Sequence, residues 1–421
     1  MRAAILAIGN EIVSGLVPDT NSGFLAERLL AAGVEPVATF AVPDDDVAIH
    51  RALERALEDA EVVISTGGLG PTDDDITTEV VARLTGRELT LDEGSLAAIE
   101  ARFRARGMTM SSNNYKQALF PDGSTVIPNP AGTAPGLICQ VGRGSAVRHV
   151  VCLPGVPAEM RRMAVETVIP WLEGFAPSRR FASRVFSTVG ITESQLGELL
   201  GGVVAPQEAH LAFRAAFPRV QASLTISGSG EDPLEERLDS LELRVRERLG
   251  QHLYAVGDLG MEEVVGELLQ ARGLTLALAE SCTGGLIGHR ITSVPGSSAY
   301  FLLGVVTYSN EAKERQLGVR HATLQRFGAV SPETAAEMAE GARRAARASV
   351  GLATTGIAGP GGATEGKPVG TVCIGLARKD GVLWSHRYDL GDRGRDWIKE
   401  MTAQLALDRL RIHLLGERGE R

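Results

Sequence analysis

The sequence predicts an α/β protein with an α/β domain at each end and a small α+β module between them. Strand-like and helix-like segments alternate at short intervals in both terminal parts, which is typical of βαβ units and a mainly parallel sheet. The 421 residues are enough for two or three domains that each bury a core. We expect these domains to span residues 1–172, 178–252 and 258–418.

In the first part, short apolar runs alternate with amphipathic stretches. Residues 46–59 carry apolar side chains at helical spacing, whereas residues 62–65 form the continuous apolar run of a buried parallel strand. That run ends in Thr66-Gly67-Gly68, a turn where the backbone can approach a ligand closely. The expected strands are 3–8, 34–42 and 62–65, and the expected helices are 22–32 and 46–59.

The middle part has a different pattern and is too short for another doubly wound sheet. A small α+β module with KH-like or ferredoxin-like packing fits it better. KH domains ordinarily bind RNA, but Gly201-Gly202-Val203-Val204 is not the basic Gly-x-x-Gly loop that binds backbone phosphates. The expected strands are 184–189, 209–213 and 220–227, and the expected helices are 193–200 and 233–249.

The third part contains a strand-turn-helix unit with a candidate nucleophile. Residues 274–278 form an apolar run, residues 279–285 have the sequence Ala-Glu-Ser-Cys-Thr-Gly-Gly, and residues 286–291 begin a helical pattern. This order puts Ser281 at the carboxyl edge of a sheet, where free backbone N–H groups stabilise a developing oxyanion or bind an anion. The same residues also suit an ordinary Ser/Thr helix cap, so both interpretations are open at this point.

A serine nucleophile needs a base, and Lys313 is the better candidate for it. Residues 304–309 lead from a buried strand into a helix whose expected N-cap is Asn310. The helix dipole and burial both lower the pKa of a lysine in that first turn, although a solvated surface lysine is the alternative. No histidine of this part follows an obvious strand end; these histidines are His289, His321, His386 and His413.

A glycine-rich loop follows another strand of the third part. Residues 353–362 have the sequence Ala-Thr-Thr-Gly-Ile-Ala-Gly-Pro-Gly-Gly, whose backbone amides can approach a phosphate closely. The loop does not match the Walker pattern, because no Gly-Lys-Ser/Thr follows it. Arg395 is a further candidate partner for an anion.

Composition narrows the class of protein. The net charge is −9 and charges of both signs are interspersed, so the sequence shows no basic stripe for nucleic acid. No apolar run is long enough to span a membrane, and the short apolar run at the N-terminus does not suit a signal peptide. Four distant cysteines without a CxxC pair suit a reducing cytoplasm and argue against structural zinc; they are Cys139, Cys152, Cys282 and Cys373. We expect a soluble, cytoplasmic protein.

Together, the segments of the third part resemble the C-terminal domain of the CinA family, the PncC-type nicotinamide-nucleotide amidohydrolase. The resemblance covers residues 262–415 and rests on Ala-Glu-Ser-Cys-Thr-Gly-Gly, Tyr-Ser-Asn-Glu-Ala-Lys and Thr-Gly-Ile-Ala-Gly-Pro-Gly-Gly. It implies deamidation of nicotinamide mononucleotide to nicotinic acid mononucleotide with release of ammonia, without a cofactor. By this resemblance Ser281 is the nucleophile and Lys313 its base, while Tyr308 and Thr355 position the proton network and the substrate.

The same resemblance implies a set of substrate-binding positions. Arg395 would suit the nucleotide phosphate through a bidentate contact. The positions are Thr283, Gly284, Gly285, Ser298, Gly356, Ala358, Gly359 and Arg395.

An acidic, glycine-rich stretch in the first part marks a second candidate site. Residues 66–77 have the sequence Thr-Gly-Gly-Leu-Gly-Pro-Thr-Asp-Asp-Asp-Ile-Thr, and carboxylates are hard oxygen ligands that suit a divalent cation. An acidic first helical turn is the alternative, which we favour for Asp73 and leave open for Asp74 and Asp75. The polar residues at 10–11 and 19–21 could face the same edge of the sheet.

The first part resembles the molybdopterin-binding fold of the MoaB and MogA proteins in its CinA version, over residues 1–171. Two motifs carry this resemblance: the acidic, glycine-rich stretch and Leu-Pro-Gly-Val-Pro-Ala-Glu-Met at residues 153–160. The family association implies metal-dependent hydrolysis of ADP-ribose to AMP and ribose 5-phosphate, a reaction in which carboxylates hold a metal that neutralises phosphate charge and activates water. Molybdopterin-related binding is the alternative from fold analogy. Tyr115 stands where a basic residue is expected.

The divalent ion for this activity would be Mg, Mn or Co, with K⁺ as a further candidate. The expected metal ligands are Asp74, Asp75 and Glu159. The expected substrate-binding residues are Asn10, Thr20, Asn21, Gly67, Gly68, Gly70, Thr72, Gly155 and Pro157.

The sequence therefore predicts a bifunctional hydrolase that recycles two products of NAD breakdown, and the resemblance implies a homodimer. The competing class is a non-enzymatic accessory in DNA uptake or recombination. The acidic balance argues against direct DNA binding, which leaves a protein partner such as RecA for that class.

Overall fold

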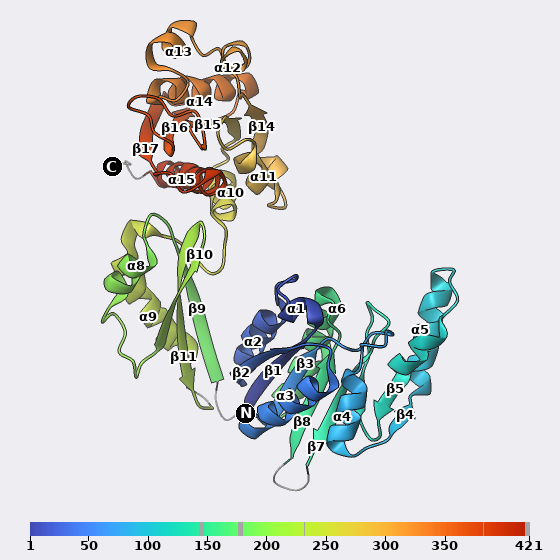
Figure 1. The fold of residues 1–421 in the computed structure, drawn as a ribbon. Helices are drawn as coiled ribbons and strands as arrows, with labels where there is room; N and C mark the ends of the chain where they lie inside the picture. Colours follow the sequence, from blue (N-terminus) through green and yellow to red (C-terminus); the bar gives the residue numbers. More distant parts are fainter. Residues whose placement is uncertain (143–146, 176–179, 231, 382, 417–421) are drawn as a thin grey trace. The chain divides into compact units, whose positions relative to one another are not determined.

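The computed structural model describes residues 1–142, 147–175, 180–230, 232–381 and 383–416 (Figure 1). Contacts divide the chain into two compact units, Met1–Ala182 with Ile226–Leu238 and Ser183–Thr225 with Asp239–Arg421. The predicted domain limits at 178 and 418 lie outside the described residues. No helix of the described part is long and apolar enough to cross a membrane.

The N-terminal part is built on a six-stranded sheet with the order β2-β1-β3-β8-β7-β6. The four strands from β2 to β8 are parallel, and β7 is antiparallel to both of its neighbours, β8 and β6. Helices cover both faces of the sheet (Figure 1), and the central strands β1 and β3 are accordingly buried and mostly apolar, apart from the exposed Arg2. The strands are β1 (Arg2–Ile8), β2 (Glu35–Val42), β3 (Val62–Thr66), β6 (Thr125–Ile127), β7 (Gly136–Val141) and β8 (Arg148–Leu153).

Two core clusters lie on opposite faces of this sheet. Ile49 and Val80, from α3 and α4, pack in one cluster, and Leu25 and Met160, from α2 and α6, pack in the other. The N-terminal part also contains a separate two-stranded sheet of β4 (Leu89–Leu91) and β5 (Leu119–Pro121). The helices are α1 (Asn10–Val13), α2 (Asn21–Ala31), α3 (Asp46–Asp59), α4 (Thr77–Thr85), α5 (Glu93–Ala105), η1 (Ser112–Ala118), α6 (Pro157–Met163), η3 (Ala164–Val168) and α7 (Ile169–Glu173).

The middle part has a four-stranded sheet with the order β10-β11-β9-β12 and two α-helices of 8 and 16 residues, so the expected α+β module is confirmed. A capping box starts α8: Thr192 accepts from the amide of Gln195, whose side chain accepts from the amide of Thr192. The elements are β9 (Arg180–Thr188), α8 (Glu193–Leu200), β10 (His210–Ala216), β11 (Arg219–Gly228), α9 (Leu234–Leu249), η4 (Gly250–His252) and β12 (Leu253–Val256).

The C-terminal part has a mixed sheet with the order β14-β13-β15-β16-β17. β13 is parallel to both of its neighbours, whereas β16 is antiparallel to both of its own, β15 and β17. Helices α10, α11 and α15 pack on one face and α12, α13 and α14 on the other. The strands are β13 (Leu276–Glu280), β14 (Phe301–Val306), β15 (Val350–Gly356), β16 (Thr371–Arg378) and β17 (Leu383–Asp389). The helices are α10 (Met261–Ala271), α11 (Leu286–Thr292), η5 (Ser297–Ala299), α12 (Asn310–Leu317), α13 (His321–Phe327), α14 (Pro332–Ala346) and α15 (Arg395–Leu415).

Candidate active sites

The parallel strands of the C-terminal sheet end at one edge, and a cavity of about 270 Å³ lies there. Segments that are far apart in the sequence meet in it, because the carboxyl ends of neighbouring parallel strands share an edge. Eight of the predicted residues line this cavity: Ser281, Tyr308, Lys313, Thr355, Gly356, Ala358, Gly359 and Arg395.

Ser281 and Lys313 are in direct contact. Lys313 Nζ donates to Ser281 Oγ at 3.2 Å and to the carbonyl oxygen of Thr307 at 2.8 Å. Lys313 is only 1% exposed, and this burial lowers its pKa. The buried position shows that the surface-lysine alternative is wrong, and the lowered pKa favours the neutral amine that a base requires.

The helix that carries Lys313 begins one residue earlier than expected. Ser309 is the N-cap of α12, and its side chain accepts from the amide of Ala312. Asn310 is therefore the first helical residue, which corrects its expected role as N-cap. Lys313 still lies in the opening of the helix, with its side chain directed to Ser281.

Among the described residues, no histidine lines the cavity. His321 instead contacts the side chain of Glu314, at 2.8 Å from Nδ1 to Oε1. Cys282 does line the cavity, but burial raises the pKa of its thiol to about 12. The cysteine is thus protonated at neutral pH, and Ser281 is the better nucleophile of the two.

Three amides at the start of α11 are already bonded and are not available to an anion. The buried carboxylate of Glu280 accepts from the amides of Gly285, Ile287 and Gly288 at 2.8–3.1 Å. Glu280 therefore satisfies the helix N-terminus that the sequence offered to an anion.

Three predicted binding residues of this turn serve the fold instead. The hydroxyls of Thr283 and Thr354 lie 2.8 Å apart and link the turn to β15, while Gly284 and Gly285 adopt positive φ angles. Ser298 lies exposed on η5. None of Thr283, Gly284, Gly285 and Ser298 lines the cavity.

The glycine-rich loop after β15 forms another wall of the cavity. Within the described part of the chain, the amides of Ala358, Gly359 and Gly361 have no hydrogen-bond partner, so they are free to bind a ligand. The sequence motif correctly pointed to this loop. The residues of the cavity that were not singled out from the sequence are Cys282, Ala329, Val330, Ile357, Gly361 and Gly362. Ala329 and Val330 lie outside the quoted motifs, whereas the other four lie within them.

Arg395 connects this loop to Tyr308. Its guanidinium donates from Nη1 to the carbonyl oxygen of Gly359 at 2.8 Å and from Nη2 to the Tyr308 hydroxyl at 3.0 Å. Thr355 Oγ1 donates to the carbonyl oxygen of Ala329 at 2.8 Å. Arg395 is exposed, whereas Ser281 and Lys313 are buried. The guanidinium therefore lies at the entrance of the cavity and the Ser281–Lys313 pair at its floor.

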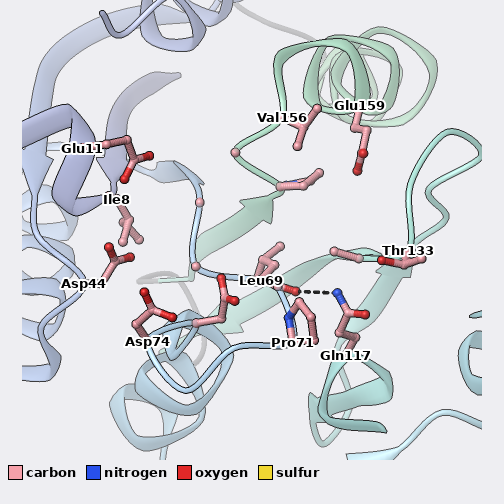
Figure 2. Close-up of a pocket in the computed structure, with 18 residues that line it drawn as sticks. Ile8, Glu11, Asp44, Leu69, Pro71, Asp74, Gln117, Thr133, Val156 and Glu159 are labelled. Atoms are coloured by element: carbon pink, nitrogen blue, oxygen red, sulfur yellow. Dashed lines mark hydrogen bonds between the residues drawn. The ribbon is translucent and has the colours of Figure 1, made fainter. Parts of the chain in front are cut away.

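The N-terminal sheet also has a cavity at its carboxyl edge, with a volume of about 510 Å³. Figure 2 shows Glu11, Asp44 and Asp74 on one side of this carboxylate pocket and Glu159 across from them. The predicted residues that line it are Gly67, Gly68, Gly70, Asp74, Asp75, Gly155 and Glu159.

Two of the glycines are required by close contacts. Gly67 and Gly68 have φ angles of 109° and 67°, and a Cβ atom would lie 2.1 Å from the Ile8 carbonyl oxygen or from Thr77 Oγ1, respectively. A side chain at Gly67 would collide with backbone, and at both positions the positive φ angle would strain any other residue. Because these two residues have no side chain, a ligand in the cavity can contact the backbone of the turn after β3 directly.

Asp74 and Asp75 converge on one hydroxyl. Oxygens of both carboxylates are placed to accept from Thr72 Oγ1, although a single hydroxyl hydrogen can serve only one of them. Asp75 also accepts from the amide of Thr72 at 2.9 Å, so Thr72 organises the acidic loop and does not line the pocket. This surplus of acceptor oxygens suits a shared cation.

Glu159 is held away from this pair. Its Oε2 accepts from Asn129 Nδ2 at 2.7 Å. Across the described ranges, no group of three His, Cys, Asp or Glu side chains is placed closely enough to hold a metal ion. Asp74 and Asp75 alone would suit an ion such as Mg²⁺, which is bound through one or two carboxylates together with water and substrate phosphate.

Four other predicted residues do not line the carboxylate pocket. Asn10 is exposed at the start of α1, Thr20 precedes α2, and Pro157 is the exposed first residue of α6. Asn21 supports the pocket from behind, since its Nδ2 donates to the carbonyl oxygen of Gly155 at 2.8 Å. The expectation that they face the ligand is therefore wrong for this set: Asn10, Thr20, Asn21 and Pro157.

The structure also brings in residues that the sequence did not single out. Asp44 follows β2, and burial raises the pKa of its carboxyl, with the charges of Glu11, Asp74 and Asp75 acting in the same direction. The one sign in the sequence that could have identified Asp44 is its position just after a strand.

Tyr115, at the position where a basic residue is expected, is exposed. The neighbouring Lys116 supplies a cation to the acidic loop instead, since its Nζ donates to the carbonyl oxygen of Thr72 at 2.7 Å.

Three family models match successive stretches of the chain. They are described as "Probable molybdopterin binding domain" over residues 4–174, "Damage-inducible protein CinA KH domain" over residues 183–255, and "CinA C-terminal domain" over residues 258–414.

Full-length relatives were also found. Proteins described as CinA-like from Geobacter metallireducens and Desulfosudis oleivorans are 43% and 42% identical, and each alignment covers 99% of this chain and 100% of the relative. A crystal structure of the competence/damage inducible protein CihA from Agrobacterium tumefaciens is 43% identical, covers 37% of this chain and 97% of its own, and has a TM-score of 0.35.

Proposed function

The chain belongs to the CinA family, and on that premise we propose that its C-terminal site hydrolyses the carboxamide of nicotinamide mononucleotide to a carboxylate and ammonia. The observation that supports this proposal most strongly is the contact between the Ser281 hydroxyl and the buried Lys313 amine, at 3.2 Å. A serine and a lysine whose pKa is lowered by burial together provide a nucleophile and a base without histidine or metal.

In the proposed reaction, Ser281 Oγ attacks the carboxamide carbon while Lys313 Nζ takes the hydroxyl proton. The tetrahedral intermediate collapses as the C–N bond breaks, and Lys313 passes the proton to the leaving nitrogen, so that ammonia departs. Water then attacks the ester at the same carbon and Lys313 takes its proton. The bond to Ser281 breaks, and the proton returns to the serine oxygen.

The remaining cavity residues support binding of a nucleotide amide. The free amides of Ala358, Gly359 and Gly361 can stabilise the negative charge that develops on the carbonyl oxygen or hold an anionic group. Arg395 presents a cation at the entrance, where it suits the 5′-phosphate. Tyr308, which accepts from Arg395, would help to hold that cation in place.

We further propose that the N-terminal site hydrolyses the pyrophosphate of ADP-ribose to AMP and ribose 5-phosphate. Two glycine turns and five carboxylates meet in the carboxylate pocket, which suits a phosphate chain together with a divalent cation. Asp74 and Asp75 would hold that cation, which supplies charge neutralisation and an activated water when bound. Lys116, tied to the acidic loop, offers a further positive charge.

The test is to incubate the purified full-length protein with each substrate separately, with and without EDTA. Ammonia release from nicotinamide mononucleotide should persist with the chelator, because the Ser281–Lys313 pair needs no metal. AMP release from ADP-ribose should stop. Equal sensitivity of both reactions to chelator would contradict the assignment of separate chemistries.

A second function for the N-terminal domain is favoured by one observation, the match to a molybdopterin-binding family model. On this alternative the carboxylate pocket binds a pterin phosphate and cleaves nothing. Tight binding of such a ligand, together with no turnover of ADP-ribose, would favour it. The homodimer and the cytoplasmic location implied by the resemblance stay predictions, as does an accessory role with a protein partner.

A further inference from the structure

A second cavity of the N-terminal domain adjoins the carboxylate pocket. Its volume is about 480 Å³, and Thr133 lines both cavities. Thr133 belongs to the loop at residues 128–135, between β6 and β7, so the two cavities meet at this loop. A ligand long enough to pass Thr133 can therefore occupy both.

The two cavities differ in chemistry. The carboxylate pocket offers carboxylates and glycine turns, whereas the second cavity is walled mostly by aliphatic side chains and proline rings. Such surfaces suit a flat heteroaromatic ring, which gains from leaving water, and they suit a sugar or a phosphate poorly. The apolar wall consists of Ala98, Ile99, Val126, Pro128, Pro130 and Pro135.

The loop between the cavities is held by hydrogen bonds on both sides. Asn129 Nδ2 donates to the carbonyl oxygen of Ala134 at 2.9 Å and to Glu159 Oε2 at 2.7 Å, which ties the loop to the carboxylate pocket. On the other side, Arg102 of α5 donates to the carbonyl oxygens of Asn129 at 3.2 Å and Pro130 at 2.8 Å. The cavity is therefore formed before any ligand binds, which lowers the entropic cost of binding.

We propose that this second cavity is the nucleobase subsite of the N-terminal site. The inference rests on the proposed pyrophosphatase function and extends it. The base of the substrate occupies the apolar cavity, its ribose passes Thr133, and its pyrophosphate lies among the glycine turns and carboxylates. The substrate class is thus nucleoside diphosphate compounds, and pyrophosphates that lack a base are poor substrates.

A pair of neighbouring alanines on α5 allows a matched test. Ala97 and Ala98 are both exposed, but only Ala98 lines the cavity. Ala98→Trp should fill the cavity, whereas Ala97→Trp adds the same side chain to the same helix outside it. Circular dichroism and thermal unfolding of both full-length variants establish that each is folded.

Binding of AMP and of ribose 5-phosphate, a ligand without a base, is measured by calorimetry. Ala98→Trp should weaken AMP binding by about tenfold or more, whereas Ala97→Trp should change it by less than about twofold. Ribose 5-phosphate should bind all three proteins alike. Failure of the wild type to bind AMP, or equal AMP affinity in Ala98→Trp and wild type, would overturn the subsite.

Turnover of ADP-ribose separates this inference from the proposed function. A wild-type protein that binds AMP in a manner sensitive to Ala98→Trp, but does not cleave ADP-ribose, supports the base subsite and contradicts the pyrophosphatase. A wild-type protein that cleaves ADP-ribose with a KM unchanged in Ala98→Trp supports the pyrophosphatase and overturns the subsite.

Discussion

Lys313 could act as a base or only anchor the substrate, and the two roles predict different behaviour of its variants. Ser281→Ala and Lys313→Ala should each lower the deamidase kcat by about a thousandfold or more, because each removes half of the proton-transfer pair. Lys313→Arg keeps the charge but cannot release a proton near neutral pH, so it should fail as badly as Lys313→Ala. The double variant should be little worse than either single one.

The assay for these variants is ammonia release, with ADP-ribose hydrolysis as the internal control that all of them should retain. An active Lys313→Arg enzyme with a raised KM would mean that Lys313 anchors the substrate. Additive losses in the double variant would mean that Ser281 and Lys313 do not act as one unit.

Burial of Lys313 also predicts a pH-dependent effect on stability. The pKa of this lysine is lowered in the folded protein, so between that lowered pKa and the ordinary lysine pKa the unfolded chain binds more protons. Stability from this residue therefore rises with pH across that window. Lys313→Met removes the buried amine, and we expect the variant to be more stable than the wild type at neutral pH, although inactive as a deamidase.

Urea unfolding of both proteins between about pH 7 and pH 10 measures this effect. The advantage of Lys313→Met should shrink as the pH rises. A variant that is less stable than the wild type at pH 7 would show that the bonds from Lys313 to Ser281 and Thr307 outweigh the cost of its burial.

In the N-terminal site, the test residue is Asp75. Asp75→Asn keeps the size of the side chain and can still contact Thr72, but it removes the charge that a divalent cation needs. We expect ADP-ribose hydrolysis to fall by about a hundredfold or more and deamidation to be unchanged. The exposed neighbour Asp73 does not line the pocket, so Asp73→Asn is the matched control. Full activity of Asp75→Asn would place the metal elsewhere.

Glu280 holds the turn between β13 and α11, which carries Ser281, in place. Its carboxylate accepts from three amides at the start of α11, and it is 2% exposed. Glu280→Ala leaves those donors without partners, at a cost of about 2–3 kcal/mol in the free energy of unfolding. The deamidase kcat should fall with it, because Ser281 is the next residue. Glu267→Ala, at an exposed position of α10, should change stability by less than about 0.5 kcal/mol, and denaturant unfolding measures both.

At the scale of single elements, the sequence predicts those helices and buried strands that have a clear local pattern, whereas the elements of residues 77–173 were not named. The helix expected at 46–59 is α3 with the same bounds, and the strand expected at 62–65 is β3 with one residue more. The strand at 253–256 was missed, since its four residues are too few to show a period and its pairing with β9 joins distant segments. The capping of α12 by Ser309 was misassigned by one residue, because Ser309 and Asn310 are both good caps.

The sites were predictable to the extent that they lie in local motifs. The glycine-rich loop after β15 and the acidic loop after β3 could be identified from the sequence alone. The expectation that residues 10–11 face the same edge holds for Glu11, which lines the pocket. The approach of Asp44 to Asp74 could not be predicted, because it depends on how turns from separate strands meet. The contact of Glu280 with the start of α11 is local, but the strand pattern does not show that this carboxylate turns onto the helix amides. Ser281 and Lys313 were paired through the family resemblance, and the structure supplies the distance.

At the scale of the whole molecule, the middle module shares a core with the C-terminal sheet. Tyr254 and Val189 lie in the same buried cluster as residues of α10 and α15, and the Tyr254 hydroxyl donates to the carbonyl oxygen of Leu259 at 3.1 Å. Arg411 of α15 reaches back to the carbonyl oxygen of Gln251 at 3.1 Å. The cavity of the Ser281–Lys313 pair, in contrast, takes all its lining residues from 281–395.

This division predicts different outcomes for stability and catalysis when the chain is shortened. Fragments 183–421 and 255–421 should deamidate nicotinamide mononucleotide with the same kcat, because both contain the complete cavity. Fragment 255–421 lacks Tyr254 and Val189, and loss of a buried aromatic side chain costs about 3–5 kcal/mol, so it should unfold at a clearly lower temperature. Equal melting temperatures would mean that the shared core adds nothing to the C-terminal sheet. A folded but inactive fragment 255–421, beside an active 183–421, would mean that the middle module positions the cavity as well as stabilising it.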